Sequence, residues 1–242
     1  MRTLYHSDNS YAAQKVRVYL AEKGIQWKSH HFNLLKQEHL LDEAYRKINP
    51  RGLVPALQDG EAIVCNSTEI MEYIAKTYLS ENEKKSQLTD DVHDFCNNDE
   101  LLHDPHLRTL SYYYLWMKKE ASDEEKNRIV TLAKSHPDKA RGEFLAKAIQ
   151  RNFSLEDVEQ SKIAIEISLK NLEKLLSNFK SEFLFGDEYT MADSAATVRL
   201  YRINSFEKNV DFQVNQYPLT TAYYEKMKQR QSFSEIESSY GK

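Results

Sequence analysis

Three short segments in the first 70 residues carry groups that could bind or activate a ligand. The first is Leu53-Val54-Pro55, where a proline opens an expected strand. A proline there places the strand at a sheet edge or beside a turn. A cis Val54-Pro55 bond costs only about 0.5–1 kcal/mol and would leave the backbone of Val54 outside the ladder. Such an edge can bind an extended peptide through main-chain hydrogen bonds, although a purely structural turn is the simpler interpretation.

The second segment is Asn66-Ser67, which follows an expected strand and opens a helix. Serine is a favoured N-cap and asparagine suits the preceding turn, so capping alone would explain the pair. The free N–H groups at a helix start also attract carboxylates. In that case Ser67 would donate its hydroxyl to a carboxylate and Asn66 would contact an amino group. The two interpretations are compatible.

The third segment is the polar loop from Ser7 to Tyr11, between the first strand and the first helix. It would lie at the C-terminal edge of the sheet, where ligands of open α/β folds bind. The hydroxyls of Ser10 and Tyr11 could stabilise an anion at that edge. A loop serine more commonly forms a turn or caps a helix.

The elements that position these segments follow a βαβαββα order in residues 1–80. Strands are expected at 3–6, 27–34, 54–58 and 61–65, and helices at 13–23, 38–47 and 67–79. Asp59-Gly60 is a strong hairpin signal between the last two strands. This order predicts a mixed sheet with helices packed on it.

The second half of the chain has helical periodicity throughout. Helices are expected at 92–119, 123–134, 138–150, 155–179, 191–206 and 220–231. We therefore predict an α/β domain over residues 1–80, a charged linker over 81–86 and an all-helical domain over 87–242.

Composition excludes several classes of protein. The 242 residues include 33 basic and 37 acidic side chains, which argues against a nucleic-acid partner. No apolar run approaches the roughly 20 residues of a membrane span, and the N-terminus does not resemble a signal peptide. Cys65 and Cys96 match neither a disulfide framework nor a metal site, and His103 and His106 fit a helix start better than metal ligation. We expect a cytoplasmic protein without a metal.

The segments together resemble the glutathione transferase superfamily over nearly the whole chain. Residues 48–57 resemble its cis-proline signature, 66–74 its γ-glutamyl-binding segment and 185–193 its helix-capping box, with Thr190 as N-cap and Asp193 as its partner. The ending, 217–233, is also similar. The first half is most like the serine-type enzymes: theta, zeta and bacterial enzymes similar to lignin β-etherases.

This resemblance implies a thioredoxin-like glutathione-binding domain followed by an all-α domain. It implies a homodimeric detoxification enzyme that activates the thiolate of glutathione, its co-substrate, for attack on an apolar or aromatic electrophile. The reaction could be conjugation, ether or halide displacement, peroxide reduction or isomerisation. One alternative is a non-catalytic binding or regulatory protein of the same fold. Another is a redox thiol enzyme using Cys65 or Cys96.

The resemblance also implies roles for single residues. A glutathione thiol with a pKa near 8.5 needs about 2.7 kcal/mol of selective stabilisation to lower that pKa by 2 units. One hydrogen bond to a charged group supplies about 1.5–3 kcal/mol. Ser10 occupies the position of the theta and zeta serine, Tyr11 adjoins it, and Tyr5 and His6 lie near the tyrosine of other classes. The implied glutathione contacts are His39, Leu53, Val54, Pro55, Asn66 and Ser67. The implied electrophile contacts are Tyr112, Tyr113 and Trp116.

Overall fold

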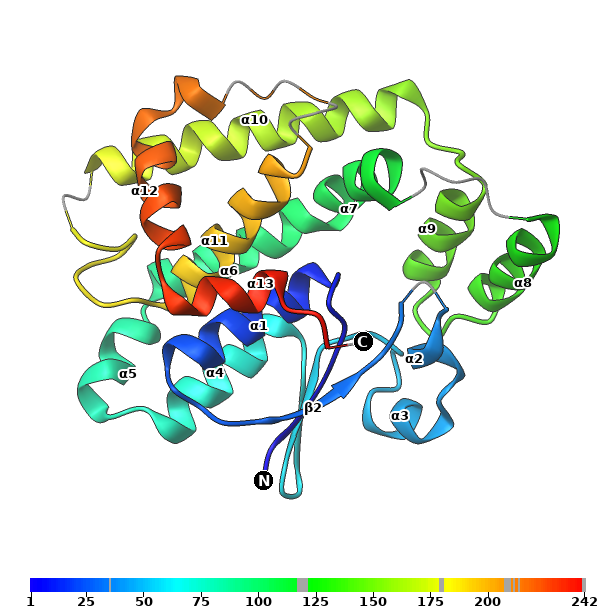
Figure 1. Ribbon diagram of the computed structural model, residues 1–242, viewed down its shortest axis with the longest axis horizontal. Coiled ribbons are helices and arrows are strands. Elements are labelled where there is room, and N and C mark those ends of the chain that lie inside the picture. Colours follow the sequence, from blue (N-terminus) through cyan, green and yellow to red (C-terminus); the bar gives the residue numbers. More distant parts are fainter. Residues whose placement is uncertain are drawn as a thin grey trace.

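A four-stranded mixed sheet forms the base of the molecule (Figure 1). The strands are β1 (Thr3–His6), β2 (Lys28–His31), β3 (Ala56–Asp59) and β4 (Ala62–Cys65), in the spatial order β2-β1-β3-β4. β1 runs parallel to β2 and antiparallel to β3, and β3 pairs with β4 across the Asp59-Gly60 turn. The predicted mixed sheet is confirmed. The computed structural model describes residues 1–34, 36–116, 122–178, 181–206, 210, 212 and 214–240.

The register of the sheet brings the three candidate segments to one edge. Tyr5 pairs with Ala56, which in turn pairs with Cys65. The end of β1, the start of β3 and the end of β4 therefore lie side by side. Three segments adjoin that edge: the loop after His6, the Val54-Pro55 segment before β3 and the helix start after Cys65.

Helices cover both faces of the sheet. Side chains alternate between the faces along a strand, so Leu57 and Ala56 point in opposite directions. Leu57 packs in the main core with α1 (Tyr11–Glu22) and α4 (Ser67–Tyr78). Ala56 packs on the other face with Phe32 and with Tyr45 of α3 (Glu43–Ile48), which follows the short α2 (Glu38–Leu41).

The second half of the described chain is helical. Its helices are α5 (Glu81–Gln87), α6 (Asp90–Leu102), α7 (Arg108–Leu110), α8 (Asp123–Lys134), α9 (Lys139–Ile149), α10 (Leu155–Asn178), α11 (Met191–Asn204), α12 (Pro218–Lys228) and α13 (Ser234–Glu237). Shorter π-helical segments span His103–Leu107 and Ser111–Trp116, and 3₁₀ segments span Val214–Gln216 and Gln231–Phe233. The charged segment over 81–86 forms α5, which opens with a capping box of Ser80 and Glu83.

The long helix expected over 92–119 is interrupted, which corrects the prediction. α6 ends at Leu102, and Asp104 has the extended dihedrals φ −115° and ψ 108°. Pro105 explains the break, because it lacks an N–H and its ring disfavours helical geometry in the residue before it. Helical geometry resumes in wider π-turns that carry the aromatic cluster, while positions 117–119 lie outside the described residues.

Two helical units matter for the site. α11 lies in the centre of the fold against α1 and α6, and Asp193 accepts the Thr190 N–H in the predicted capping box. The α8–α9 hairpin stands over α2 (Figure 1), where Leu40 packs among its apolar side chains.

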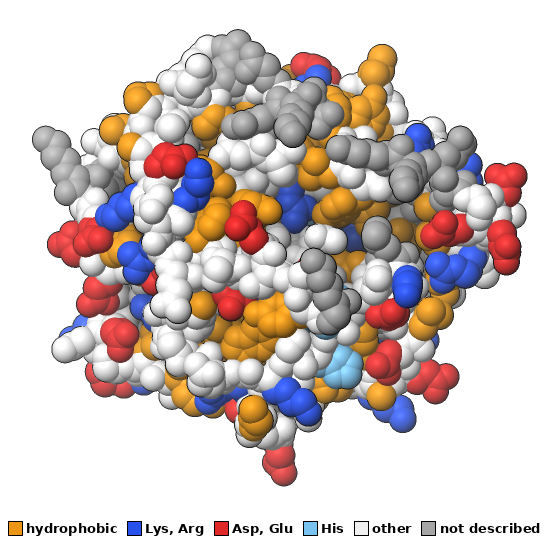
Figure 2. Space-filling model, viewed as in Figure 1, with side chains coloured by type: hydrophobic (Ala, Val, Ile, Leu, Met, Phe, Trp, Pro, Cys, Tyr) orange, Lys and Arg blue, Asp and Glu red, His pale blue; other side chains and the backbone are white. Residues whose placement is uncertain are grey.

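No helix among the described residues combines the length and the apolar character needed to cross a membrane. On the face drawn in Figure 2, acidic and basic side chains are intermixed.

Candidate active site

A cavity of about 730 Å³ opens at the edge of the sheet. One wall consists of the β1–α1 loop, the segment before β3 and the start of α4. The opposite wall includes residues from the end of α6, the π-helical segments, α7 and α9. The cavity therefore joins the sheet edge to the helical half, at the place that the three sequence segments predicted.

Ser10 lies in the cavity wall and caps α1. Its Oγ accepts the N–H of Ala13 at 3.3 Å, and the residue is 8% exposed. Within the described part of the chain, this hydroxyl has no acceptor for its own proton. The capping interpretation is correct, and it leaves the hydroxyl proton free to donate into the cavity.

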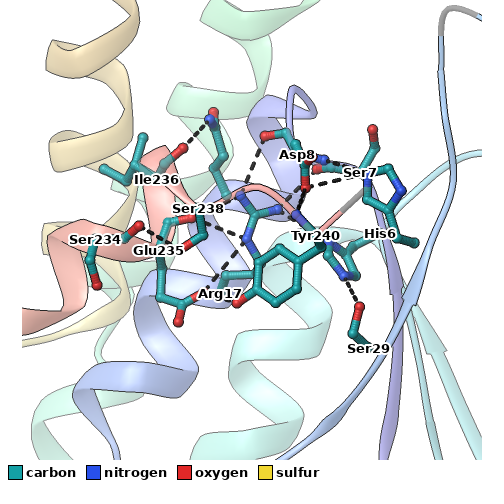
Figure 3. A network of polar contacts seen from close by, with 12 residues as sticks. His6, Ser7, Asp8, Arg17, Ser29, Ser234, Glu235, Ile236, Ser238 and Tyr240 are labelled. Carbon is teal, nitrogen blue, oxygen red and sulfur yellow. Dashed lines mark hydrogen bonds and ion pairs between the residues drawn. The ribbon is translucent and has the colours of Figure 1, made fainter. Parts of the chain in front are cut away.

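Two buried arginines fix the loop that carries Ser10. Arg17 donates to the carbonyls of Ser7 at 2.9 Å and Asp8 at 3.3 Å, and Arg202 donates to the carbonyl of Asn9 at 3.2 Å. Figure 3 shows the Arg17 network, in which the N–H of Tyr240 also reaches the Asp8 carboxylate. Sequence reasoning missed both arginines. The only signal for Arg17 was a cation within an otherwise largely apolar helix.

Tyr11 already has a partner for its hydroxyl. Its Oη donates to Asp99 Oδ1 at 2.6 Å, and Asp99 also accepts from Lys15 at 2.9 Å and Arg199 at 2.9 Å. Burial, and then the Asp99 charge, raises the pKa of Tyr11 well above its ordinary value. Burial alone would raise the pKa of Asp99, but Lys15 and Arg199 outweigh that effect and lower it. The Tyr11 ring lines the cavity while its hydroxyl points to Asp99.

Tyr5 and His6 do not line the cavity. The hydroxyl of Tyr5 donates to Gln58 at 3.1 Å. The ring nitrogens of His6 contact Ser29 at 2.8 Å and Arg17 at 3.3 Å (Figure 3). Burial, followed by the Arg17 charge, lowers the pKa of His6 to about 3. Of the four candidate thiol-activating side chains, Ser10 alone combines a place in the wall with an uncommitted donor among the described residues.

Leu53, Val54 and Pro55 line the cavity beside this loop. The Val54-Pro55 peptide bond is cis. The β1–β3 ladder begins at Ala56, so the backbone groups of Val54 lie outside it. The carbonyl of Leu53 is occupied, because it accepts from the Tyr45 hydroxyl and from the Asn49 amide.

The start of α4 binds a carboxylate in this structure, that of Glu100 from α6. Oε1 of Glu100 accepts from the hydroxyls of Ser67 at 3.2 Å and Thr68 at 2.6 Å, and Oε2 accepts from the Asn66 amide at 3.0 Å. Burial opposes the charge on Glu100, but Lys15 and these donors keep its pKa below the ordinary value. The N-cap is Asn66 rather than Ser67, because the Asn66 oxygen accepts the Thr68 N–H at 2.8 Å.

His39 also lines the cavity and is 7% exposed, since the α8–α9 hairpin covers α2. His39 is therefore not a solvent-exposed helix residue. Nδ1 of His39 is buried and has no hydrogen-bond partner. Burial, and then Arg141 and His136, lowers the pKa of His39 to about 3, so the ring is neutral at pH 7.

The expected aromatic wall is only partly present. Tyr112 and Trp116 line the cavity with their ring centroids 4.9 Å apart, edge to face. Phe144 of α9 extends this aromatic cluster, 5.3 Å from Tyr112. Tyr113 lies outside the cavity, is 41% exposed and packs on Tyr114. Consecutive residues cannot share one face of a helix, which separates Tyr113 from its neighbour.

The two cysteines are poorly suited to thiolate chemistry. Cys65 lines the cavity, and burial raises the pKa of its thiol. Cys96 is buried in the core, where burial raises its pKa to about 12. A thiol with a raised pKa is a weak nucleophile, which disfavours a redox role. The described residues contain no group of three His, Cys, Asp or Glu side chains placed to hold a metal ion.

Comparison with known proteins identifies the family. The model of the N-terminal domain of glutathione S-transferases matches residues 4–82, and that of the C-terminal domain matches residues 143–236. The chain belongs to the glutathione S-transferase family. The predicted superfamily, fold and enzyme class are confirmed. Residues 83–142, which supply much of the helical cavity wall, lie outside both matches.

Individual relatives support this assignment over the whole chain. The chain is 22% identical to glutathione S-transferase TCHQD of Arabidopsis thaliana, covering 98% of this chain and 90% of the relative. It is 27% identical to glutathione S-transferase Z1 of the same plant, covering 95% and 88%. The crystal structure of the β-etherase LigF from Sphingobium sp. strain SYK-6 has the same fold, with a TM-score of 0.77 at 21% identity over 98% of both chains.

Proposed function

We propose that this glutathione S-transferase binds glutathione along the sheet edge and activates its thiol through Ser10. The observation that carries the proposal is the carboxylate already bound at the start of α4. That anion site lies at the same edge of the sheet as the backbone of Val54 and the hydroxyl of Ser10. A γ-glutamyl tripeptide carries the matching carboxylate, peptide backbone and thiol in that order.

Each part of glutathione then has a binding group. The γ-glutamyl carboxylate takes the position of the Glu100 carboxylate on Ser67 and Thr68, and Glu100 turns to the adjacent ammonium group. The backbone of the cysteinyl unit pairs with Val54 beside Pro55, as an added strand does. His39 lies near the glycyl end. Residue 66 is an asparagine, whereas the family usually has an acid or a glutamine there. In this proposal Glu100 supplies the missing acid.

Thiol activation requires only a hydrogen bond and a favourable field. The Ser10 hydroxyl donates a hydrogen bond to the thiolate, at the N-terminus of α1 where the helix dipole favours negative charge. Arg17 and Arg202 hold the loop carbonyls, so the hydroxyl is already oriented when the thiol binds. The thiol proton leaves to solvent, and the sulfur forms a bond to the electrophile as the leaving group departs with its electron pair.

The remaining roles follow from the same placement. Tyr112 and Trp116 contact the apolar part of the electrophile, and residues 87–242 form the domain that carries them, joined through 81–86 to the glutathione-binding domain 1–80. A cytoplasmic homodimer with a detoxifying role is supported by the family resemblance alone. Light scattering on the purified chain would measure the oligomeric state.

Calorimetry and a turnover assay test this function. Glutathione should saturate the protein at millimolar concentration or below, and the protein should accelerate its reaction with 1-chloro-2,4-dinitrobenzene. Ser67→Ala should weaken glutathione binding about tenfold, the effect of one hydrogen bond to a charge. Ser177→Ala, on the exposed face of α10, is the matched control. Absence of saturation would contradict the proposal, and binding without turnover of any electrophile would indicate a non-catalytic binding protein.

A further inference from the structure

Two arginines lie beside the aromatic wall of the cavity. Arg108 comes from α7 and Arg141 from α9, and both line the cavity. Their guanidinium carbons lie 5.4 and 5.3 Å from the ring centroid of Phe144, which itself contacts Tyr112. Burial, followed by the Arg141 charge, lowers the pKa of Arg108 to about 10. Two like charges therefore share one apolar surface.

One of these charges has a counter-ion among the described residues. Arg108 forms an ion pair with Asp104, whose side chain is about half exposed. Among the described residues, no carboxylate pairs with the guanidinium of Arg141, and its Nη1 is buried without a hydrogen-bond partner. The nearby histidines do not change this balance, because burial and the surrounding cations lower the pKa values of His39 and His103 and keep both rings neutral at pH 7.

A guanidinium group that has a buried N–H without a partner is unfavourable in isolation. Leaving a buried donor unsatisfied costs about 1–3 kcal/mol, and more for a charged group. Guanidinium groups match carboxylates in shape and charge, with two parallel N–H donors facing two oxygens. A ligand carboxylate in this part of the cavity would satisfy Arg141 and separate its charge from that of Arg108.

We propose that the second substrate is an acid whose apolar or aromatic body lies on Tyr112 and Trp116 and whose carboxylate is bound by Arg141 and Arg108. The inference deepens the proposed function and rests on it, because the acid is the electrophile that the glutathione thiolate attacks. The glycyl end of glutathione is the other carboxylate that could reach Arg141, through the neighbouring His39. Arg108 and the aromatic cluster favour the electrophile.

The first experiment compares an acid with its uncharged ester. Glutathione-dependent turnover of 4-chloro-3,5-dinitrobenzoate and of its methyl ester is measured, each relative to its uncatalysed rate. Arg141→Met should lower kcat/KM for the acid at least tenfold and change that for the ester less than threefold. Arg128→Met, an exposed arginine of the same hairpin outside the cavity, should change neither. Equal losses for acid and ester in Arg141→Met would overturn the proposal.

A binding experiment without glutathione separates this inference from the proposed function. Calorimetry compares 3,5-dinitrobenzoate with the uncharged 3,5-dinitrobenzamide. The wild-type protein should bind the acid at least tenfold more tightly, and Arg141→Met should abolish that preference even if the protein has no transferase activity. Equal affinity for acid and amide in the wild type would overturn the inference and leave the glutathione site untouched.

The final arm addresses the glycyl carboxylate. Glutathione and its glycyl monoethyl ester are titrated into the wild type and into Arg141→Met. We expect Arg141→Met to leave both affinities within twofold of the wild-type values. A loss of glutathione affinity that removes its preference over the ester would assign Arg141 to glutathione instead, and would overturn the proposal.

Discussion

Two clusters of charged side chains flank the cavity, a buried one around Asp99 and a partly exposed one around Phe144, and they differ in how many of their charges have partners among the described residues. Around Asp99, one carboxylate accepts from Tyr11, Lys15 and Arg199, which join α1, α6 and α11. Around Phe144, the half-exposed Asp104 pairs with Arg108, but no carboxylate among the described residues pairs with Arg141. The first cluster is complete within the chain, and the second is not.

This difference indicates that the Asp99 cluster stabilises the fold, whereas the Phe144 cluster binds a ligand. A buried ion pair is tolerated when hydrogen bonds satisfy every member, as they do at Asp99. A cluster that opens on a cavity and lacks a counter-charge gains its partner from the ligand. The hydroxyls of Tyr11 and Ser10 show the same contrast, since the Tyr11 hydroxyl donates to Asp99 and the Ser10 hydroxyl has no acceptor within the described part of the chain.

The largest expected effect is on stability, from Asp99→Asn. Removing the carboxylate charge leaves Lys15 and Arg199 buried without a counter-ion, which should lower the free energy of unfolding by about 3–5 kcal/mol. Arg141→Met removes a charged group whose buried Nη1 has no partner, so it should leave the free energy of unfolding unchanged or raise it, by up to about 1–3 kcal/mol. Urea unfolding monitored by circular dichroism measures both. Similar losses in the two variants would remove the distinction between the clusters.

The next effect concerns the two hydroxyls. Ser10→Ala should raise the apparent pKa of bound glutathione by about 2 units and reduce turnover near neutral pH about 100-fold, equivalent to about 2.7 kcal/mol. Tyr11→Phe should leave that pKa unchanged and lower the stability instead, because only Asp99 loses a partner. The ultraviolet absorbance of the bound thiolate, followed against pH, reports the pKa directly. A raised thiol pKa in Tyr11→Phe, with a normal one in Ser10→Ala, would reverse the assignment.

A smaller effect should appear in the pH dependence of stability, through His39. Its pKa is about 3 in the folded chain and about 6.5 in the unfolded chain, so between these values the unfolded state binds more protons. Stability therefore rises with pH across this window and is lost on acidification, by at most roughly 1.4 kcal/mol per pH unit. His39→Gln should reduce the slope between pH 6.5 and about 5. His30→Gln, on the exposed strand β2, is a control.

Much of the sheet edge was predictable because its signals are local in sequence. Pro55, the Asp59-Gly60 turn and the Asn66-Ser67 helix start each lie within a few residues of the element that they define. The order of elements then fixes where the three segments meet. Ser10, Val54 and Ser67 were placed at the cavity for that reason.

The charged wall was not predictable, because its meaning depends on distant partners. From the sequence, Glu100 and Asp99 look like ordinary solvent-exposed helix residues. Only the packing of α4 and α1 against them shows otherwise. Arg108 and Arg141 read in the same way, since nothing in their own segments shows that they face one cavity. The prediction for the aromatic residues was partly wrong for a different reason: Tyr112 and Trp116 are four residues apart and share one helical face, whereas Tyr113 adjoins Tyr112 and cannot lie on that face.

The smallest expected effect distinguishes two aromatic residues, Trp116 and Tyr113. Trp116 lines the cavity between Tyr112 and the guanidinium of Arg202, whereas Tyr113 is outside it. Trp116→Ala removes apolar contact with the electrophile and should raise the KM for the methyl ester of 4-chloro-3,5-dinitrobenzoate about tenfold, roughly 1.4 kcal/mol. Tyr113→Ala should change it less than twofold, and the KM for glutathione should stay constant in both. Equal effects of the two substitutions on the ester would mean that the electrophile does not lie on the wall that Trp116 forms.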